Sequence, residues 1–184
     1  EVWSVLSGLA AGTTIISFRS NPTCFSTGIY TVTAAPAPIV GPDKVCIGST
    51  ILLTHTTPGG TWSGSAPTKG SIATDGTLRG LSAGSVVITY NTGSCFTTTT
   101  VSVNTPPTNI NGTATVCEGA TTTLTNATAG GSWINDGGNA MVGSATGIVT
   151  GIAAGTSVIS YQIITTGCVT TREVTINATP TIID

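Results

Sequence analysis

Charged side chains are scarce in this sequence, and their scarcity excludes several classes of protein. Only 7% of its 184 residues are Asp, Glu, Lys or Arg, against roughly 25% in an average soluble domain. With five Lys plus Arg, a formal charge of −2 and no basic run, the chain lacks the electrostatic footprint of a nucleic-acid-binding protein or a polybasic membrane anchor. Ser, Thr and Gly interrupt every apolar run well short of the roughly 18 residues of a membrane span. We therefore expect no nucleic-acid partner and no membrane insertion.

Residue patterns for catalysis and metal binding are also lacking. The chain has one histidine, His55, and no Cys-x-x-Cys pair, whereas a zinc site or a catalytic triad needs several such groups. Its carboxylates form no recognisable acid–base pair, and Asp75-Gly76 and Asp136-Gly137 are typical of tight turns. A zinc–thiolate site, a catalytic His55 and a weak calcium site at a turn or connector stay open as alternatives. The favoured interpretation is a chain that is not an enzyme and has neither a cofactor nor a metal site.

The residues that are abundant favour strands and turns over helices. Thr, Ser, Asn and 24 Gly take the place of charge, and hydrophobic residues still make up 39% of the chain. Thr and other β-branched residues suit a pleated, half-buried strand, and Gly and Asn suit turns. Regularly spaced apolar residues and low charge argue against disorder.

A repeat with a period of about 71 residues organises the chain. The matching pairs are Cys46 and Cys117, Trp62 and Trp133, and Gly84 and Gly155. The segment GLAAGTTIISF at 8–18 also matches GLSAGSVVITY at 80–90, so the chain is expected to begin in the middle of a unit and to be part of a longer array. We expect residues 1–37 to be the C-terminal half of a truncated repeat, 38–108 a complete repeat, and 109–184 a complete repeat plus the start of the next linker.

Within a unit, apolar residues alternate with a period of two, which predicts strands with one buried face. The core residues predicted in this way, together with the tryptophans of the repeat, are Ile16, Phe18, Trp62, Ile88, Tyr90, Trp133, Ile159 and Tyr161. Seven strands are expected in the middle unit, near 44–47, 49–55, 60–64, 70–74, 77–80, 85–91 and 95–103. The predicted fold is all-β: tandem antiparallel immunoglobulin-like β-sandwiches joined end to end by semi-rigid, proline-containing connectors.

The motifs of the repeat resemble a known family. The run TWSGS at 61–65 followed by GSIATDGTLRGLSAGSVVITY at 70–90 resembles the bacterial immunoglobulin-like domains of group 2. The Cys-x-Gly segments at Cys46 and Cys117, with a late Cys in each unit, resemble the disulfide-bearing version found in giant repetitive cell-surface proteins of the Bacteroidetes, including gliding-associated adhesins. This resemblance implies extracellular stalks and adhesins, with cell adhesion and gliding motility as associated roles.

Each complete unit has one early and one late cysteine, which predicts one disulfide per unit. The expected pairs are Cys46 with Cys95 and Cys117 with Cys168, while Cys24 is expected to pair upstream of the fragment. Disulfides persist in oxidising surroundings, so these bonds predict an extracellular location on a bacterial cell surface.

The function expected from these features is mechanical. The chain is predicted to be a stalk or fibre segment of a surface adhesin or extracellular filament, with neighbouring immunoglobulin-like repeats as its partners. The alternative is a carbohydrate-binding adhesive module that contacts surface glycans through its loop tips, with an exposed tryptophan as a stacking platform. The repeated positions of Trp62 and Trp133 favour burial in a sandwich core.

Overall fold

The computed structural model describes residues 5–20 and 23–180. In this part of the chain every regular element is a β-strand, and no helix long and apolar enough to cross a membrane is found there. Of the expected terminal linker, residues 181–184 lie outside the described residues.

The N-terminal part is a two-stranded antiparallel hairpin, β1 (Gly12–Arg19) and β2 (Phe25–Val32), here called the hairpin. Ile16 and Phe18, predicted as core residues, are 36% and 73% exposed, so that prediction is wrong for this part of the chain. The alternation along β1 correctly places both on one face of the hairpin, but no second sheet packs on that face among the described residues. Burial needs two layers, and a strand pattern specifies only one of them.

The first sandwich (residues 44–104) contains the seven strands expected. They are β3 (Lys44–Cys46), β4 (Thr50–Leu52), β5 (Thr61–Gly64), β6 (Gly70–Ile72), β7 (Thr77–Gly80), β8 (Gly84–Asn91) and β9 (Phe96–Asn104). One sheet has the order β3-β9-β8-β5 and the other β4-β7-β6. The predicted all-β sandwich fold is confirmed, with strand ends close to those expected.

The second sandwich (residues 111–177) repeats this plan with one additional short strand. Its strands are β10 (Asn111–Gly112), β11 (Thr115–Cys117), β12 (Thr121–Thr125), β13 (Gly131–Asn135), β14 (Ala140–Val142), β15 (Ile148–Gly151), β16 (Gly155–Ile163) and β17 (Val169–Asn177). The sheets have the orders β11-β17-β16-β13 and β10-β12-β15-β14.

Each sandwich departs at its early strand from the antiparallel arrangement that was predicted. The early strand runs parallel to the last strand: β3 pairs with β9 and β11 with β17. Lys44 faces Ser102 and Cys46 faces Asn104, so β3 lies beside the C-terminal end of β9. This parallel pair decides where the early cysteine of each unit lies.

Each sandwich has its own core between its two sheets. The buried cluster of the first sandwich consists of Val45, Leu53, Leu78, Val86, Ile88, Val101 and Val103, with Trp62 packed against it. That of the second consists of Ile110, Val116, Leu124, Trp133, Ala140, Val149, Ile159, Tyr161, Val174 and Ile176. Tyr90 is buried as well, at 5% exposure.

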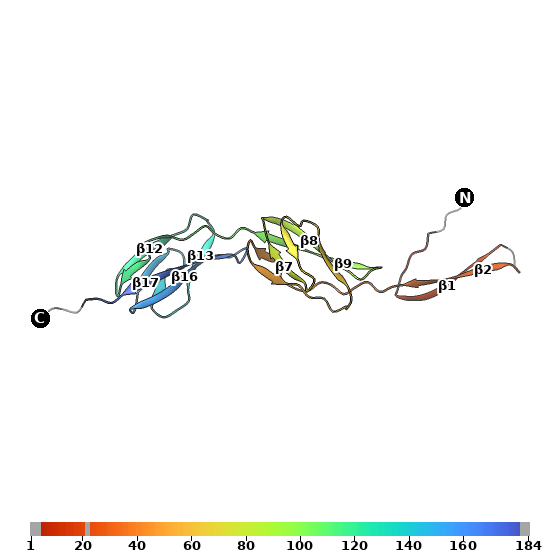
Figure 1. Cartoon of the computed structure of the whole chain (residues 1–184), viewed down its shortest axis with the longest axis horizontal. Coiled ribbons are helices and arrows are strands. Elements are labelled where there is room, and N and C mark those ends of the chain that lie inside the picture. Colours follow the sequence, from red (N-terminus) through yellow and green to blue (C-terminus); the bar gives the residue numbers. More distant parts are fainter. Residues whose placement is uncertain (1–4, 21–22, 181–184) are drawn as a thin grey trace.

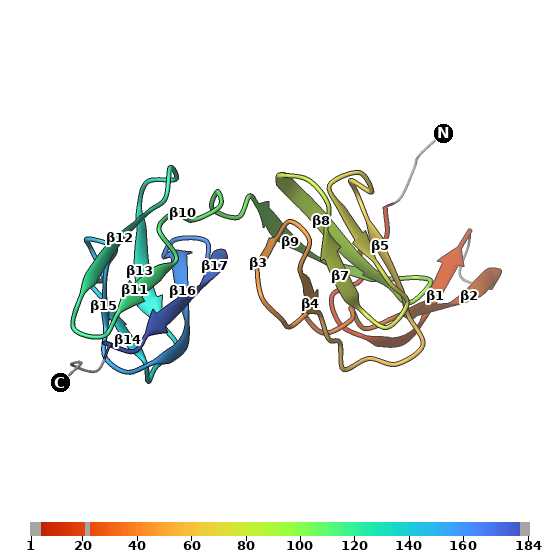
Figure 2. The same cartoon turned by 60° about the vertical axis from the view of Figure 1, so that its left-hand side comes forward.

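The hairpin and the two sandwiches follow one another along the long axis of the molecule (Figure 1). The two sandwiches also lie apart in the second view, where an extended connector and the ends of β9 and β17 occupy the space between them (Figure 2). The chain is therefore a row of separate β-units, and the junctions are the places where one unit meets the next.

Candidate functional site

The junction between the two sandwiches contains a disulfide. Cys46 of the first sandwich is bonded to Cys168 of the second, with 5.7 Å between the Cα atoms and 122 residues between them in sequence. That Cα separation lies in the usual range for a disulfide. The bond therefore joins two units that the connector already joins.

The parallel pairing of β3 brings Cys46 to the junction. Cys46 ends β3 opposite Asn104, the residue at which β9 ends and the connector begins. Val45, one residue earlier, is buried in the core of the first sandwich and anchors the strand. Because side chains alternate along a strand, burying Val45 turns Cys46 toward the other face.

The turn between β16 and β17 brings Cys168 to the same place. The N–H of Ile163 donates to Cys168 O at 2.9 Å, and the N–H of Gly167 donates to Ile163 O at 2.8 Å. Gly167 has a φ of +74°, which a residue with a Cβ adopts at a cost. This turn holds the Cys168 side chain fully buried against the first sandwich, with Sγ 3.9 Å from Asn104 O.

A further contact crosses the junction beside the disulfide. Lys44 donates from Nζ to Thr165 O at 2.8 Å, so both ends of the short strand β3 contact the turn of the second sandwich. On the other side, the connector is fixed to the second sandwich, because Pro107 and Ile110 are buried and Arg172 Nη1 donates to Ile110 O at 2.6 Å. Bending about the connector is therefore confined to the residues between Asn104 and Pro107.

The predicted disulfide pairs, Cys46 with Cys95 and Cys117 with Cys168, are wrong. Cys46 lies opposite the last residue of β9, whereas Cys95 precedes its first residue, and β9 is nine residues long. At a rise of about 3.3 Å per residue, the two cysteines lie roughly 25–30 Å apart. A disulfide spans at most about 7 Å between Cα atoms.

The same geometry separates Cys117 from Cys168, since Cys117 pairs with Asn177 at the end of the nine-residue β17. Early and late positions in a unit do not mean adjacent positions in space. A prediction that β3 pairs in parallel with β9 would have put the two cysteines of a unit at opposite ends of it.

Cys95 and Cys117 are the counterparts, in the repeat, of Cys168 and Cys46. Cys95 is a half-buried free thiol in the turn between β8 and β9, and its Sγ lies 3.9 Å from Thr33 O, just beyond the end of β2. Cys117 is an exposed free thiol at the end of β11. The expectation that Cys24 pairs upstream stays a prediction.

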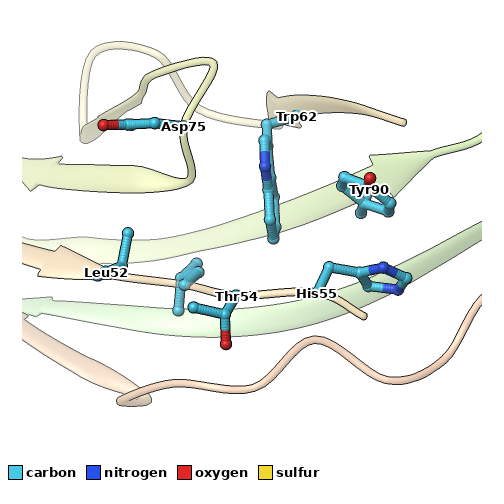
Figure 3. Close-up of a pocket in the computed structure, with 7 residues that line it drawn as sticks. Leu52, Thr54, His55, Trp62, Asp75 and Tyr90 are labelled. Carbon is cyan, nitrogen blue, oxygen red and sulfur yellow. The ribbon is translucent and has the colours of Figure 1, made fainter. Parts of the chain in front are cut away.

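The other candidate place is a shallow pocket of about 230 Å³ in the first sandwich. Trp62, Tyr90, His55 and Asp75 line it together with Leu52, Leu53 and Thr54 (Figure 3). The rings of His55 and Tyr90 stack with their centroids 4.0 Å apart, and Trp62 lies tilted on Tyr90 at 4.7 Å. The Asp75 side chain points away from the three rings (Figure 3).

Both ring nitrogens of His55 are hydrogen-bonded to backbone groups. Nδ1 accepts from the N–H of Thr57 at 3.0 Å, and Nε2 donates to Ala37 O. Tyr90 is held in the same way, since its hydroxyl donates to Thr57 O at 2.7 Å and accepts from Gly60 N at 2.9 Å. The polar atoms of these two rings therefore serve to cross-link backbone segments.

Asn126, the counterpart of His55 in the second sandwich, makes the same two contacts. Its Oδ1 accepts from Thr128 N at 2.9 Å, and its Nδ2 donates to Thr108 O at 2.6 Å. Thr108 occupies the position in its connector that Ala37 occupies in the first. An imidazole in one unit and an amide in the other thus perform one task, which is to fasten the connector to the sandwich that follows it.

Asp75 stabilises a turn. The N–H of Thr77 donates to Asp75 Oδ1 at 2.9 Å, and hydrogen bonding from Thr77 holds the pKa of this carboxyl below its usual range. The two tryptophans differ in exposure: Trp133 is buried at 7%, whereas Trp62 is half-buried and contributes one side to the pocket.

Comparison with known proteins gives likeness in structure only. No protein-family model and no curated protein sequence matches the chain. Domains 4 and 5 of the S-layer protein SbsC are 21% identical, covering 71% of this chain and 82% of theirs, with a TM-score of 0.33. N-cadherin EC1-3 from Drosophila is 11% identical, covering 84% and 72%, with a TM-score of 0.33.

A C-terminal fragment of intimin, solved in complex with the intimin-binding domain of its translocated receptor, is 17% identical. The match covers 78% of this chain and 65% of that fragment, with a TM-score of 0.44, so the chain spans a little under two thirds of the fragment's length. At these low identities and TM-scores, none of the three likenesses carries an argument about function.

Proposed function

We propose that the chain is a stalk segment of an extracellular, bacterial cell-surface protein, in which tandem sandwiches hold adhesive modules at a distance. The observation that carries this proposal is the disulfide between Cys46 and Cys168, which gives one junction two covalent connections. Two connections at different points across an interface resist bending that one flexible linker permits.

The position of the units supports the same role. They lie end to end, and each sandwich has a core of its own (Figure 1). Length in such an array grows with the number of units. The disulfide also supports an oxidising, extracellular environment.

Small-angle scattering tests the stalk proposal on the chain as it is. A compact globule of 184 residues has a radius of gyration of about 16 Å. We expect a clearly larger value for the oxidised chain, with a narrow distribution of end-to-end lengths. A radius near that of the globule would contradict the proposal.

Two cysteine variants test whether the disulfide stiffens the junction. Cys46→Ser combined with Cys168→Ser should broaden the length distribution and shorten the mean, because the junction then bends about the connector alone. Cys95→Ser removes a free thiol and should leave the scattering unchanged. An identical profile for all three proteins would show that the disulfide does not stiffen the junction.

A further inference from the structure

The cysteines of the two sandwiches occupy repeated positions at the junctions. The late cysteine lies next to the carbonyl that ends the last strand of the unit before it: Cys168 Sγ is 3.9 Å from Asn104 O, and Cys95 Sγ is 3.9 Å from Thr33 O. Thr33 follows β2 as Asn104 ends β9. Cys95 is therefore placed against the hairpin as Cys168 is placed against the first sandwich.

The early cysteines are also equivalent. Cys46 lies on β3 opposite Asn104, and Cys117 lies on β11 opposite Asn177, each in a parallel pair with the last strand of its unit. Cys46 is bonded, whereas Cys117 is exposed at the far end of the second sandwich. Cys117 thus occupies in the second sandwich the position that Cys46, bonded to Cys168, occupies in the first.

We propose that Cys117 and Cys95 are two halves of further inter-unit disulfides, with the early cysteine of each unit bonded to the late cysteine of the next. The partner at each is another copy of this repeating unit. Cys117 bonds to the late cysteine in the β16–β17-type turn of a following unit. Cys95 bonds to the early cysteine of a β3-type strand, which runs parallel to β2 with that cysteine opposite Thr33.

The hairpin has the surface that such a strand requires. The face of β1 and β2 that corresponds to the buried face of β8 and β9 exposes Ile16, Phe18 and Tyr30. In the first sandwich, β3 completes the sheet beside β9 and contributes Val45 to the core. A Val-Cys segment placed beside β2 would add the same apolar and thiol groups to the hairpin.

Forming each bond is a two-electron oxidation. Two thiols lose two protons and two electrons, and a small disulfide such as oxidised glutathione takes them up and leaves as two thiols. The exposure of Cys117 allows the attack that begins this exchange.

The consequence is a set of overlapping covalent loops. The loop from Cys46 to Cys168 encloses Cys117, so a bond from Cys117 to a following unit starts inside the first loop and ends beyond it. Every unit of a long array would then lie within a closed loop. The inference rests on the proposed function only in assuming tandem units, and disulfide mapping can fail while the scattering result stands.

The first test lengthens the chain so that a second copy of residues 105–177, in which its own Cys117 is changed to Ser, follows Asn177 and recreates the junction after Asn104. After oxidation with glutathione, proteolysis and mass spectrometry should recover Cys117 linked to the Cys168 of the added copy. Alkylation of Cys117 should fall by roughly tenfold or more relative to the original chain, since a disulfide sulfur is no longer a thiolate. A Cys117 that stays fully alkylated, or that pairs with any other cysteine, would overturn the proposal.

Controls keep this result interpretable. Cys117→Ser in the lengthened chain should leave the added Cys168 open to alkylation, whereas Cys95→Ser should leave the new bond intact. The Cys46–Cys168 peptide in the same digest reports whether the original junction has folded.

A second protein tests the predicted bond of Cys95, and it serves if the first protein does not fold. Here residues 1–7 are replaced by a copy of residues 38–79, which supplies the hairpin with the early strands of a unit. The added Cys46 should be recovered linked to Cys95. Its recovery as a thiol, or in a bond to Cys24, would count against the rule of pairing with the next unit.

Discussion

At the scale of the residue, a histidine and an asparagine do the same work. The imidazole of His55 and the amide of Asn126 each accept from a backbone N–H two residues later and donate to a connector carbonyl. An Nε2-protonated imidazole and a carboxamide share this donor–acceptor arrangement. The lone histidine of the chain thus forms a structural cross-link between the connector and the first sandwich.

Substitutions at position 55 test this explanation. We expect His55→Asn to change the free energy of unfolding of the first sandwich by less than about 0.5 kcal/mol. His55→Ala should cost about 1–3 kcal/mol, because Ala37 O and Thr57 N lose their partners. Hydrogen exchange resolved by mass spectrometry measures each sandwich separately, and equal losses for both variants would contradict the shared role.

At the scale of the element, the last strand of each sandwich sets the geometry of the junction. Nine residues of β9 or β17 separate the late cysteine at one end from the early cysteine at the other. The late cysteine precedes this strand and the early cysteine lies on the short strand paired with its other end, so the two thiols of a unit lie at opposite ends of it. The same strand contributes Val101 and Val103, or Val174 and Ile176, to its core.

The alternation along β8, β9 and β16 predicts which substitutions matter. Ile88→Ala and Ile159→Ala should each cost about 2–5 kcal/mol, since both side chains are fully buried. Thr98→Ala and Thr100→Ala, on the exposed face of β9, should stay within about 0.5 kcal/mol. Chemical denaturation of the four variants is the measurement, and similar losses at all four positions would refute the assignment of faces.

At the scale of the whole molecule, the disulfide changes how the chain carries load. Tension applied to the two ends passes from Cys46 directly to Cys168, so residues 47–167 are shielded from it. Only the segments outside the loop can be extended while the bond is intact. A stalk built in this way resists lengthening even when a sandwich unfolds.

Single-molecule pulling on the chain ends measures this shielding. The oxidised chain should show no extension from residues 47–167. Reduction should release a separation of 122 residues, roughly 400–440 Å at full extension. Cys46→Ser should behave as the reduced chain does, and Cys95→Ser as the oxidised one. Unfolding steps of a whole sandwich in the oxidised Cys95→Ser protein would contradict this path of force.

The repeat, the all-β class and the approximate position of each strand follow from the amino-acid sequence alone. These are local properties: a period of two marks one face of a strand, Asp75-Gly76 and similar pairs mark turns, and a shift of about 71 residues marks equivalent positions. Ile88, Tyr90, Ile159 and Tyr161 are buried because that alternation meets a second sheet.

Which faces are covered and which cysteines meet depend instead on how the sheets and units pack together. Ile16 follows the same alternation as Ile88, yet it is exposed because no second sheet packs on that face of the hairpin among the described residues. Cys46 and Cys95 belong to one unit, yet the parallel pairing of β3 with the end of β9 puts a whole strand between them and puts Cys168 beside Cys46. Contact between distant segments depends on how sheets and units are placed relative to one another, and periodicity within a strand carries no information about that placement.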